Sequence, residues 1–251
     1  MSLFISSVFT YDEDAGNYIQ AVETADGQAL EPATRKAINN FVIGCKQDGI
    51  WPAIKASCIL AGARTLTGAL VPLVGTAPTN FNFVSGDYNR KTGLVGDGST
   101  KYLDSGYAGS APPLNNIHGS GYFTFGNGFI VGNGMSSTST IQMNAAAQPQ
   151  RLQAATFFDT GITASPGFVG LSRSNSATMV SRRNFSSASL LYNSTGTLAD
   201  NILVFSRGSV GAPNSPSPMR IAFYSIGESL DLALLDARVT DLINAFAVTI
   251  P

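Results

Sequence analysis

The chain contains few side chains that could move a proton. His118 is its one histidine and lies in the polar stretch LNNIHGSG. A Ser-His-Asp triad needs a base that is held by an acid and aimed at a nucleophile. The G-x-S-x-G pattern of a nucleophile elbow does not occur in the sequence. We therefore expect His118 to be a surface-loop imidazole without a catalytic role.

Carboxylates are also sparse where a β-rich hydrolase would need them. Glycosidases use a pair of carboxyl groups, and between Asp104 and Glu228 only Asp159 and Asp200 are acidic. A catalytic pair of carboxylates that are distant in sequence, such as Asp97 with Asp159, stays possible. Counting residues thus predicts that the chain is not an enzyme. A glycan hydrolase that uses Asp159 or Asp200 is the least favoured alternative.

Metal and thiol chemistry are weakly indicated. Asp97 and Asp104 are carboxylates of the kind that bind calcium in loops, but Asp97 in Gly-Asp-Gly is explained by a turn alone. Calcium stays an alternative to the expected absence of any metal or cofactor. Cys45 and Cys58 are the only cysteines, without metal-ligand spacing. Their apolar surroundings favour buried free thiols over a disulfide.

The basic residues are divided along the chain. All five lysines lie within the first 101 residues, and every later basic residue is arginine. Arginine suits interfaces better than lysine because its guanidinium is planar and weakly hydrated. Arg173, Arg182 and Arg183 are therefore candidates for contacts between subunits, with the Arg182-Arg183 pair on a solvated hairpin edge. These charges are too dilute for nucleic-acid binding, and no segment is long enough for a membrane-spanning helix.

The pattern of apolar residues predicts a mainly β protein with helices at both ends. Helical spacing covers residues 12–25 and 32–48, and it returns after residue 228. Short strand candidates follow one another about every ten residues in between, as in a sandwich. They are Tyr122–Phe125, Phe129–Val131, Thr140–Asn144, Ala154–Phe158, Gly167–Leu171, Thr178–Arg182, Ser189–Tyr192, Ile202–Phe205 and Arg220–Tyr224. We predict an N-terminal arm and helical subdomain over 1–56 and a β-sandwich with a capping helix over 57–251.

Aromatic residues on strands are a second class of candidate. Tyr107 and Tyr122 are available for stacking against a sugar ring, although aromatic residues on strands more often pack in the core. We keep both as candidate ligand-binding residues.

Three stretches resemble one family. They are FVIGCKQDGIWPAIKASCILAGAR over 41–64, YNRKTGLVGDGSTKYLDS over 88–105, and RIAFYSIGESLDLALLDARVTDLINAF over 220–246. Within the second stretch, Gly96-Asp97-Gly98-Ser99 carries the signal of a tight hairpin turn. In this order the three stretches resemble the laminin-G-like, concanavalin A-like jelly-roll proteins of tailed bacteriophage virions.

The resemblance implies a jelly-roll β-sandwich on a virion and no shared catalytic residue. We expect a non-enzymatic structural protein, a surface-exposed capsid decoration or cement protein that forms a homo-oligomer and contacts other virion proteins. The alternative is a lectin-like receptor-binding module of a tail fibre or tail tip that recognises host-surface glycans.

Overall fold

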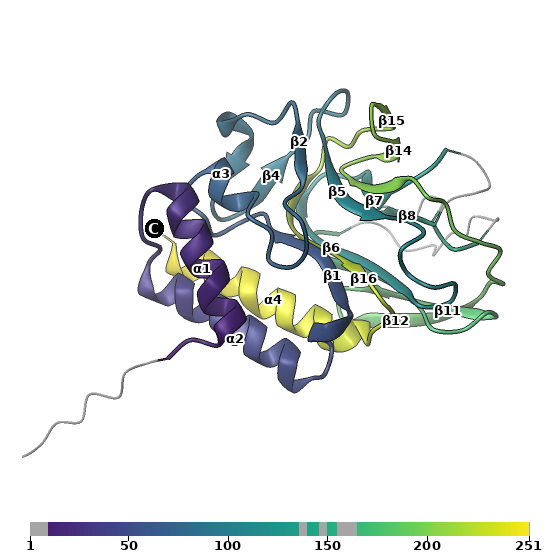
Figure 1. The fold of residues 1–251 in the computed structure, drawn as a ribbon, viewed down its shortest axis with the longest axis horizontal. Helices are drawn as coiled ribbons and strands as arrows, with labels where there is room; N and C mark the ends of the chain where they lie inside the picture. Colours follow the sequence, from purple (N-terminus) through teal and green to yellow (C-terminus); the bar gives the residue numbers. More distant parts are fainter. Residues whose placement is uncertain (1–9, 136–139, 146–149, 155–164, 251) are drawn as a thin grey trace, which may run out of the picture.

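The fold is a β-sandwich with a layer of helices on one side. A computed structural model describes residues 10–135, 140–145, 150–154 and 165–250 (Figure 1). An eight-stranded sheet and a six-stranded sheet form the sandwich, and their ladders are antiparallel. The mainly β fold predicted from the sequence, with N-terminal helices and a C-terminal helix, is confirmed. Within the described residues, no helix combines the length and apolar character that a membrane crossing needs.

The helices begin and end where their capping residues predict. Asp12 accepts a hydrogen bond from the backbone N–H of Asp14, and Gly27 ends the same helix with a φ of 63°. Pro32 occupies the first turn of the second helix. The helical elements are α1 Glu13–Asp26, α2 Pro32–Gln47, α3 Leu66–Ala69 and α4 Leu232–Thr249, with the 3₁₀ turns η1 Trp51–Ala53 and η2 Ser85–Asp87.

The strands divide between two main sheets and a small hairpin. The eight-stranded sheet has the order β12-β11-β10-β6-β16-β4-β3, with β1 also paired to β16, and the six-stranded sheet has the order β2-β5-β13-β7-β8-β9. The strands of the first are β1 Ile54–Ile59, β3 Tyr88–Asn89, β4 Gly93–Val95, β6 Ile117–Phe125, β10 Gly167–Arg173, β11 Thr178–Arg183, β12 Ser186–Leu191 and β16 Arg220–Gly227. The strands of the second are β2 Thr79–Phe81, β5 Tyr102–Ala108, β7 Phe129–Gly132, β8 Ile141–Asn144, β9 Arg151–Leu152 and β13 Asn201–Val204, while β14 Arg207–Ser209 and β15 Ala212–Asn214 pair with each other.

The centre of the eight-stranded sheet is covered on both faces. Ala222 and Phe223 of β16 pack in the core beneath the helices, whereas Ile221, Tyr224 and Ile226 pack in the core between the sheets. A strand that is buried on both faces reads as a continuous apolar run rather than an alternating one. This accounts for the run RIAFYSI, in which every residue after Arg220 is buried.

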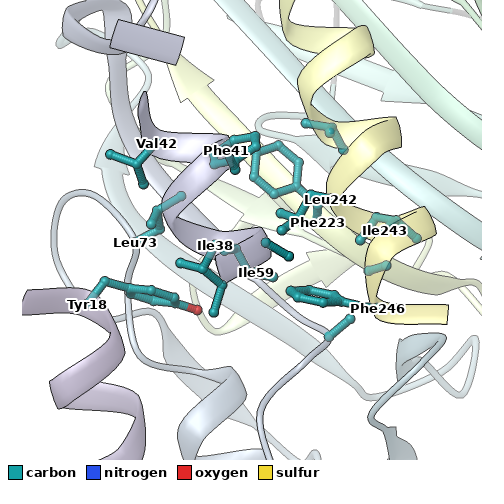
Figure 2. Packing of buried hydrophobic residues seen from close by; sticks show 14 of the residues in the cluster. Tyr18, Ile38, Phe41, Val42, Ile59, Leu73, Phe223, Leu242, Ile243 and Phe246 are labelled. Atoms are coloured by element: carbon teal, nitrogen blue, oxygen red, sulfur yellow. The ribbon is translucent and has the colours of Figure 1, made fainter. Parts of the chain in front are cut away.

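The helices join the sandwich through one apolar cluster. Figure 2 shows Phe41 of α2, Phe223 of β16 and Phe246 of α4 in this cluster, with Tyr18 of α1 at its margin. The rings of Phe41 and Phe223 meet edge to face, with centroids 5.8 Å apart. The predicted boundary between residues 56 and 57 lies inside β1, and the helices before it share this core with α4.

The predicted hairpin over 90–104 and a second turn that carries an Asn-Gly signal both connect strands of different sheets. The stretch 90–104 was expected to be a hairpin, but β4 pairs with β16 and β3, and β5 pairs with β13 and β2. The Gly126-Asn127-Gly128 stretch likewise leads from β6 in one sheet to β7 in the other. The side chain of Asp97 holds the first of these turns by accepting N–H bonds from Ser99, Thr100 and Lys101, so no ladder between the flanking strands is required.

Two other strand candidates are not seen as strands among the described residues. The apolar run over 69–71, which looks like a short strand in the sequence, begins inside the short helix α3, whose last residue is Ala69 and whose N-cap Thr65 accepts the backbone N–H of Gly68. Apart from Ala154, the strand predicted over 154–158 lies outside the described residues.

Candidate functional site

His118 is a buried strand residue and not the surface-loop imidazole that was predicted. It lies on β6 with no exposed surface. Its Nδ1 is 2.5 Å from the carbonyl oxygen of Glu228, and its Nε2 is 2.8 Å from Oγ of Ser225. A carbonyl oxygen only accepts, so Nδ1 carries the proton and Nε2 accepts the bond from the serine hydroxyl. Ser225 is also fully buried, so no substrate reaches this serine and histidine.

Burial sets the protonation state of His118. Desolvation lowers the pKa of its imidazole to about 4, although the hydrogen bond to Glu228 acts in the opposite direction. The ring is therefore neutral at pH 7. A neutral imidazole that is bonded on both nitrogens and sealed from solvent joins β6 to β16 and does not act as an accessible base.

The two candidate calcium ligands are occupied by hydrogen bonds of the chain itself. Asp97 also accepts from the hydroxyl of Thr100 at 2.7 Å. Burial raises the pKa of Asp97, but the bonds from the Thr100 hydroxyl and the turn N–H groups outweigh it and hold that pKa well below its usual range. Asp104 accepts from Gly106 and from Asn201. Among the described residues, no group of three His, Cys, Asp or Glu is placed to hold a metal ion.

The remaining candidates for chemistry are similarly placed. Cys45 and Cys58 are both free and buried, as predicted, and burial raises the pKa of each thiol to about 12. Asp200 is exposed, and its carbonyl oxygen accepts the N–H of Gly109. Asp159 lies outside the described residues.

Arg173 and Arg183 are not at an exposed interface, which corrects the expectation for them. Arg173 is fully buried at the end of β10, where its guanidinium donates to the carbonyl oxygens of Leu152 and Thr178. Arg183 is 5% exposed and donates to the carbonyl oxygens of Ala145 and Asn144. The planar fork of arginine bonds several backbone acceptors at once, which the compact ammonium of lysine does less well. The lysine-free half of the sequence thus reflects bonds inside the chain.

Arg182 is also buried, and it belongs to an ion pair and not to a solvated edge. Its Nε donates to Oδ2 of Asp236 on α4 at 2.8 Å, and its Nη1 donates to Oγ of Ser187 on β12. The Asp236 side chain has no exposed surface and also accepts the backbone N–H of Phe185 at 2.8 Å. This carboxylate therefore fixes the hairpin of β11 and β12 against the first turns of α4.

The two candidate tyrosines lie in different layers of the molecule. Tyr122 of β6 packs against the core beneath the helices, and Tyr107 of β5 packs against the core between the sheets. Both are half-buried, and burial raises the pKa of each phenol. The structure does not bring them together into one stacking platform.

Among the described residues, β12 is an outer strand of the eight-stranded sheet and has none of the features that commonly protect such an edge. It is six residues long, SSASLL, whereas the outer strands β2, β3 and β9 are three, two and two residues long. Very short strands, charges, prolines and bulges commonly protect an edge from pairing with another chain. All six residues of β12 are described, and the strand is uncharged, free of proline and paired to β11 without a register shift.

Alternate residues of β12 present their backbone groups outward. The N–H of Tyr192 donates to the carbonyl oxygen of Ala177, one step past the end of the ladder between β11 and β12. Because bonded pairs alternate along an antiparallel ladder, Ser187, Ser189 and Leu191 direct their N–H and C=O groups away from β11. Within the described part of the chain, no other residue bonds to these outward groups.

The turn that opens β12 has an unusual residue. Asn184 and Phe185 have φ values of 39° and 68°, and positive φ at both central residues is typical of a type I′ turn. Asparagine tolerates this conformation, but a bulky side chain does so rarely and at a steric cost. Phe185 is 62% exposed, so burial of its ring within this chain does not offset the cost. Strained residues cluster at functional positions, and aromatic residues, phenylalanine included, are enriched at protein–protein interfaces.

Further exposed apolar side chains lie along the same hairpin, away from the turn. Leu191, at the other end of β12, is 83% exposed, and Val180 on β11 is 37% exposed. The alternation of side chains places Val180, opposite Ser189, on the same face as Leu191. Beside Val180, a groove of about 400 Å³ separates β11 from the residues that lead into α4. Figure 1 shows β11 and β12 extending past this end of α4. We call β12 together with Val180, Phe185 and Leu191 the hairpin edge.

We expect Phe185→Gly to raise the free energy of unfolding by about 1 kcal/mol, because glycine adopts positive φ without a steric penalty and Asn-Gly is a favoured type I′ pair. Urea denaturation at low protein concentration, where association adds little to stability, measures the change. Leu191→Ser is the control and should change the stability by less than about 0.5 kcal/mol. A destabilised Phe185→Gly would mean that the ring serves the fold of this chain and not a partner.

Some signals of this site are in the sequence and others are not. Asn184 between two strand candidates marks the turn. A phenylalanine in the following position gives no sign of positive φ, since its ordinary preferences are extended. Nor does the sequence show which strand ends a sheet, because the order of strands is a tertiary property.

Two solved structures are similar to this chain over about three quarters of its length. No protein-family model matches this chain, and no curated protein matches it. Among solved structures, it is similar to the binding domain of botulinum neurotoxin serotype D, with a TM-score of 0.48 and 14% identity over 75% of this chain and 51% of that chain. It is also similar to domain 4 of AbnA, a GH43 extracellular arabinanase from Geobacillus stearothermophilus, in complex with arabinotriose. The TM-score there is 0.41, with 13% identity over 76% of this chain and 98% of that chain. This chain thus spans about half the length of the toxin chain. At such TM-scores and identities, neither an activity nor a ligand carries over.

Proposed function

We propose that this chain is a non-enzymatic structural protein. Its hairpin edge binds a neighbouring subunit. The observation that carries the proposal is the exposed ring of Phe185 on a strained turn beside an unprotected sheet edge. Four of the described groups that could transfer a proton support the non-enzymatic part. His118 is sealed in the sheet, and Asp97, Asp104 and Asp236 are each held by donors from the chain itself.

We further propose that the neighbours are virion proteins and that the chain is a decoration or cement protein on the surface of a phage particle. The resemblance of residues 88–105 and 220–246 to laminin-G-like virion proteins supports this placement. A cement protein must bind its neighbours tightly while keeping its own fold rigid. The ion pair between Arg182 and Asp236 holds the hairpin edge in place, which reduces the entropy lost on binding.

Mass spectrometry of purified particles tests this function. Particles of a phage that encodes the chain should contain it in stoichiometric amounts, and Phe185→Gly should lower its incorporation at least tenfold. Val248→Ser is the matched control, because Val248 is 86% exposed near the end of α4, away from the hairpin edge. Absence of the native chain from particles would overturn the proposal. So would glycan binding that Tyr107→Ala or Tyr122→Ala abolishes and Phe185→Gly leaves intact, because it would indicate the lectin-like alternative.

A further inference from the structure

We propose that the partner of the hairpin edge is a second copy of this chain, with β12 paired to β12 in antiparallel orientation about a two-fold axis. This inference rests on the proposed function and names the partner. The two eight-stranded sheets would then continue into one another across the axis.

The backbone of β12 is complementary to itself in this arrangement. Ser187, Ser189 and Leu191 present outward N–H and C=O groups at every second position. When the strand is turned about a two-fold axis through Ala188, Ser187 of each copy lies opposite Ser189 of the other, and their outward groups bond in pairs. Two-fold symmetry is also the commonest symmetry of soluble oligomers.

The exposed apolar side chains select this register. With the axis at Ala188, position 185 of one copy lies opposite position 191 of the other. The strained, exposed ring of Phe185 then comes next to Leu191, the most exposed residue of β12, and this contact occurs twice. The strand carries no charge, so no like charges face each other across the axis. Phe185 and Leu191, both largely exposed in the single chain, each gain an apolar contact.

A different occupant of the edge is the apolar N-terminal segment of a neighbouring copy, MSLFISSVF over residues 1–9. That segment also has no charged side chain, and its apolar and polar residues alternate less regularly than those of β12. Self-pairing is favoured because one symmetric register brings Phe185 opposite Leu191 twice and also pairs the outward backbone groups of β12.

Cysteine trapping distinguishes these arrangements. The native thiols are buried, so an introduced exposed cysteine is the one that reacts. In the proposed register, the two Ala188 residues form a non-bonded pair with Cα atoms about 4.5 Å apart, within the range of a disulfide. Ser186 lies on the same face of the same strand, but its two copies would be about 13 Å apart. Under mild oxidation we expect Ala188→Cys to form a covalent dimer in high yield and Ser186→Cys to stay monomeric.

Two further variants complete the test. Phe185→Gly combined with Ala188→Cys should slow cross-linking at least tenfold, and deletion of residues 1–9 should leave it unchanged. Equal cross-linking at positions 186 and 188, or loss of cross-linking on the deletion, would overturn the pairing of β12 with itself. If Ala188→Cys does not cross-link and the native chain is still found in particles, self-pairing is wrong while the proposed function stands. If Ala188→Cys does not cross-link and the native chain is absent from particles, both self-pairing and the proposed function are wrong.

Discussion

Asp236→Ala is expected to lower the free energy of unfolding by about 3–5 kcal/mol, which is typical of removing one partner from a buried ion pair. The variant leaves the guanidinium of Arg182 buried without a counter-ion and the backbone N–H of Phe185 without an acceptor. Because this carboxylate joins α4 to the hairpin of β11 and β12, the same variant should also weaken association. Urea denaturation followed by circular dichroism measures the loss of stability.

Two companion variants separate the ion pair from the helix that carries it. Asp241 lies on the exposed side of α4, so Asp241→Ala should change stability by less than about 0.5 kcal/mol. The double variant Arg182→Ala with Asp236→Ala should lose less than the sum of the two single losses, since it leaves no unpaired buried charge. Additive losses would show that the two side chains stabilise the fold independently.

His118 is expected to make the folded state less stable in mild acid. The pKa of its imidazole is about 4 in the fold and about 6.5 in an unfolded chain. Between these values the unfolded state binds a proton that the folded state excludes, so stability falls as the pH falls. The loss from this residue between pH 7 and pH 5 is about 2 kcal/mol, measured as the change in unfolding free energy.

Replacement of this histidine isolates its contribution. His118→Gln should lose hydrogen bonds and start from a lower stability at pH 7, but its stability should change by about 2 kcal/mol less between pH 7 and pH 5. Because the chain has one histidine, its ring resonance in the NMR spectrum reports the folded pKa directly. A midpoint near 6.5 in the native state would contradict the sealed environment between β6 and β16.

The helices and the sandwich were predictable because local signals determine them. Asp12 before the first helix, Pro32 in the second and the apolar stripe from Leu232 to Phe246 are properties of short segments. The repeated short apolar runs with glycine between them require an antiparallel β fold of some kind. The bulk of the architecture follows from these patterns.

The connections between strands were not predictable in the same way. A tight turn such as Gly96-Asp97-Gly98 looks the same whether the chain returns alongside its own strand or crosses to the facing sheet. Pairing with distant strands decides between the two: β4 pairs with β16 and β5 with β13, and Asp97 holds the turn that connects them. The burial of His118 was missed for a related reason, because its partners Ser225 and Glu228 are more than one hundred residues away.

Residue type also failed to predict where the arginines lie. Arginines were expected at contacts between subunits because they tolerate interfaces well, but Arg173 and Arg183 bond backbone carbonyl groups inside the sandwich. The hairpin edge, which we propose as the interface, consists instead of serine, alanine, leucine, valine and one phenylalanine, and these residue types give no interface signal in a sequence. Their position at a sheet edge and the backbone conformation of Phe185 distinguish them.

Hydrogen–deuterium exchange of the β12 amides, followed as protein concentration rises, tests the central claim most directly. In the isolated chain the outward N–H groups of Ser187, Ser189 and Leu191 should exchange rapidly. They should become protected as the chains associate, and Phe185→Gly should keep them unprotected at the same concentration. Rapid exchange of these amides at every concentration and in assembled particles would contradict the assignment of the hairpin edge as the surface through which this protein works.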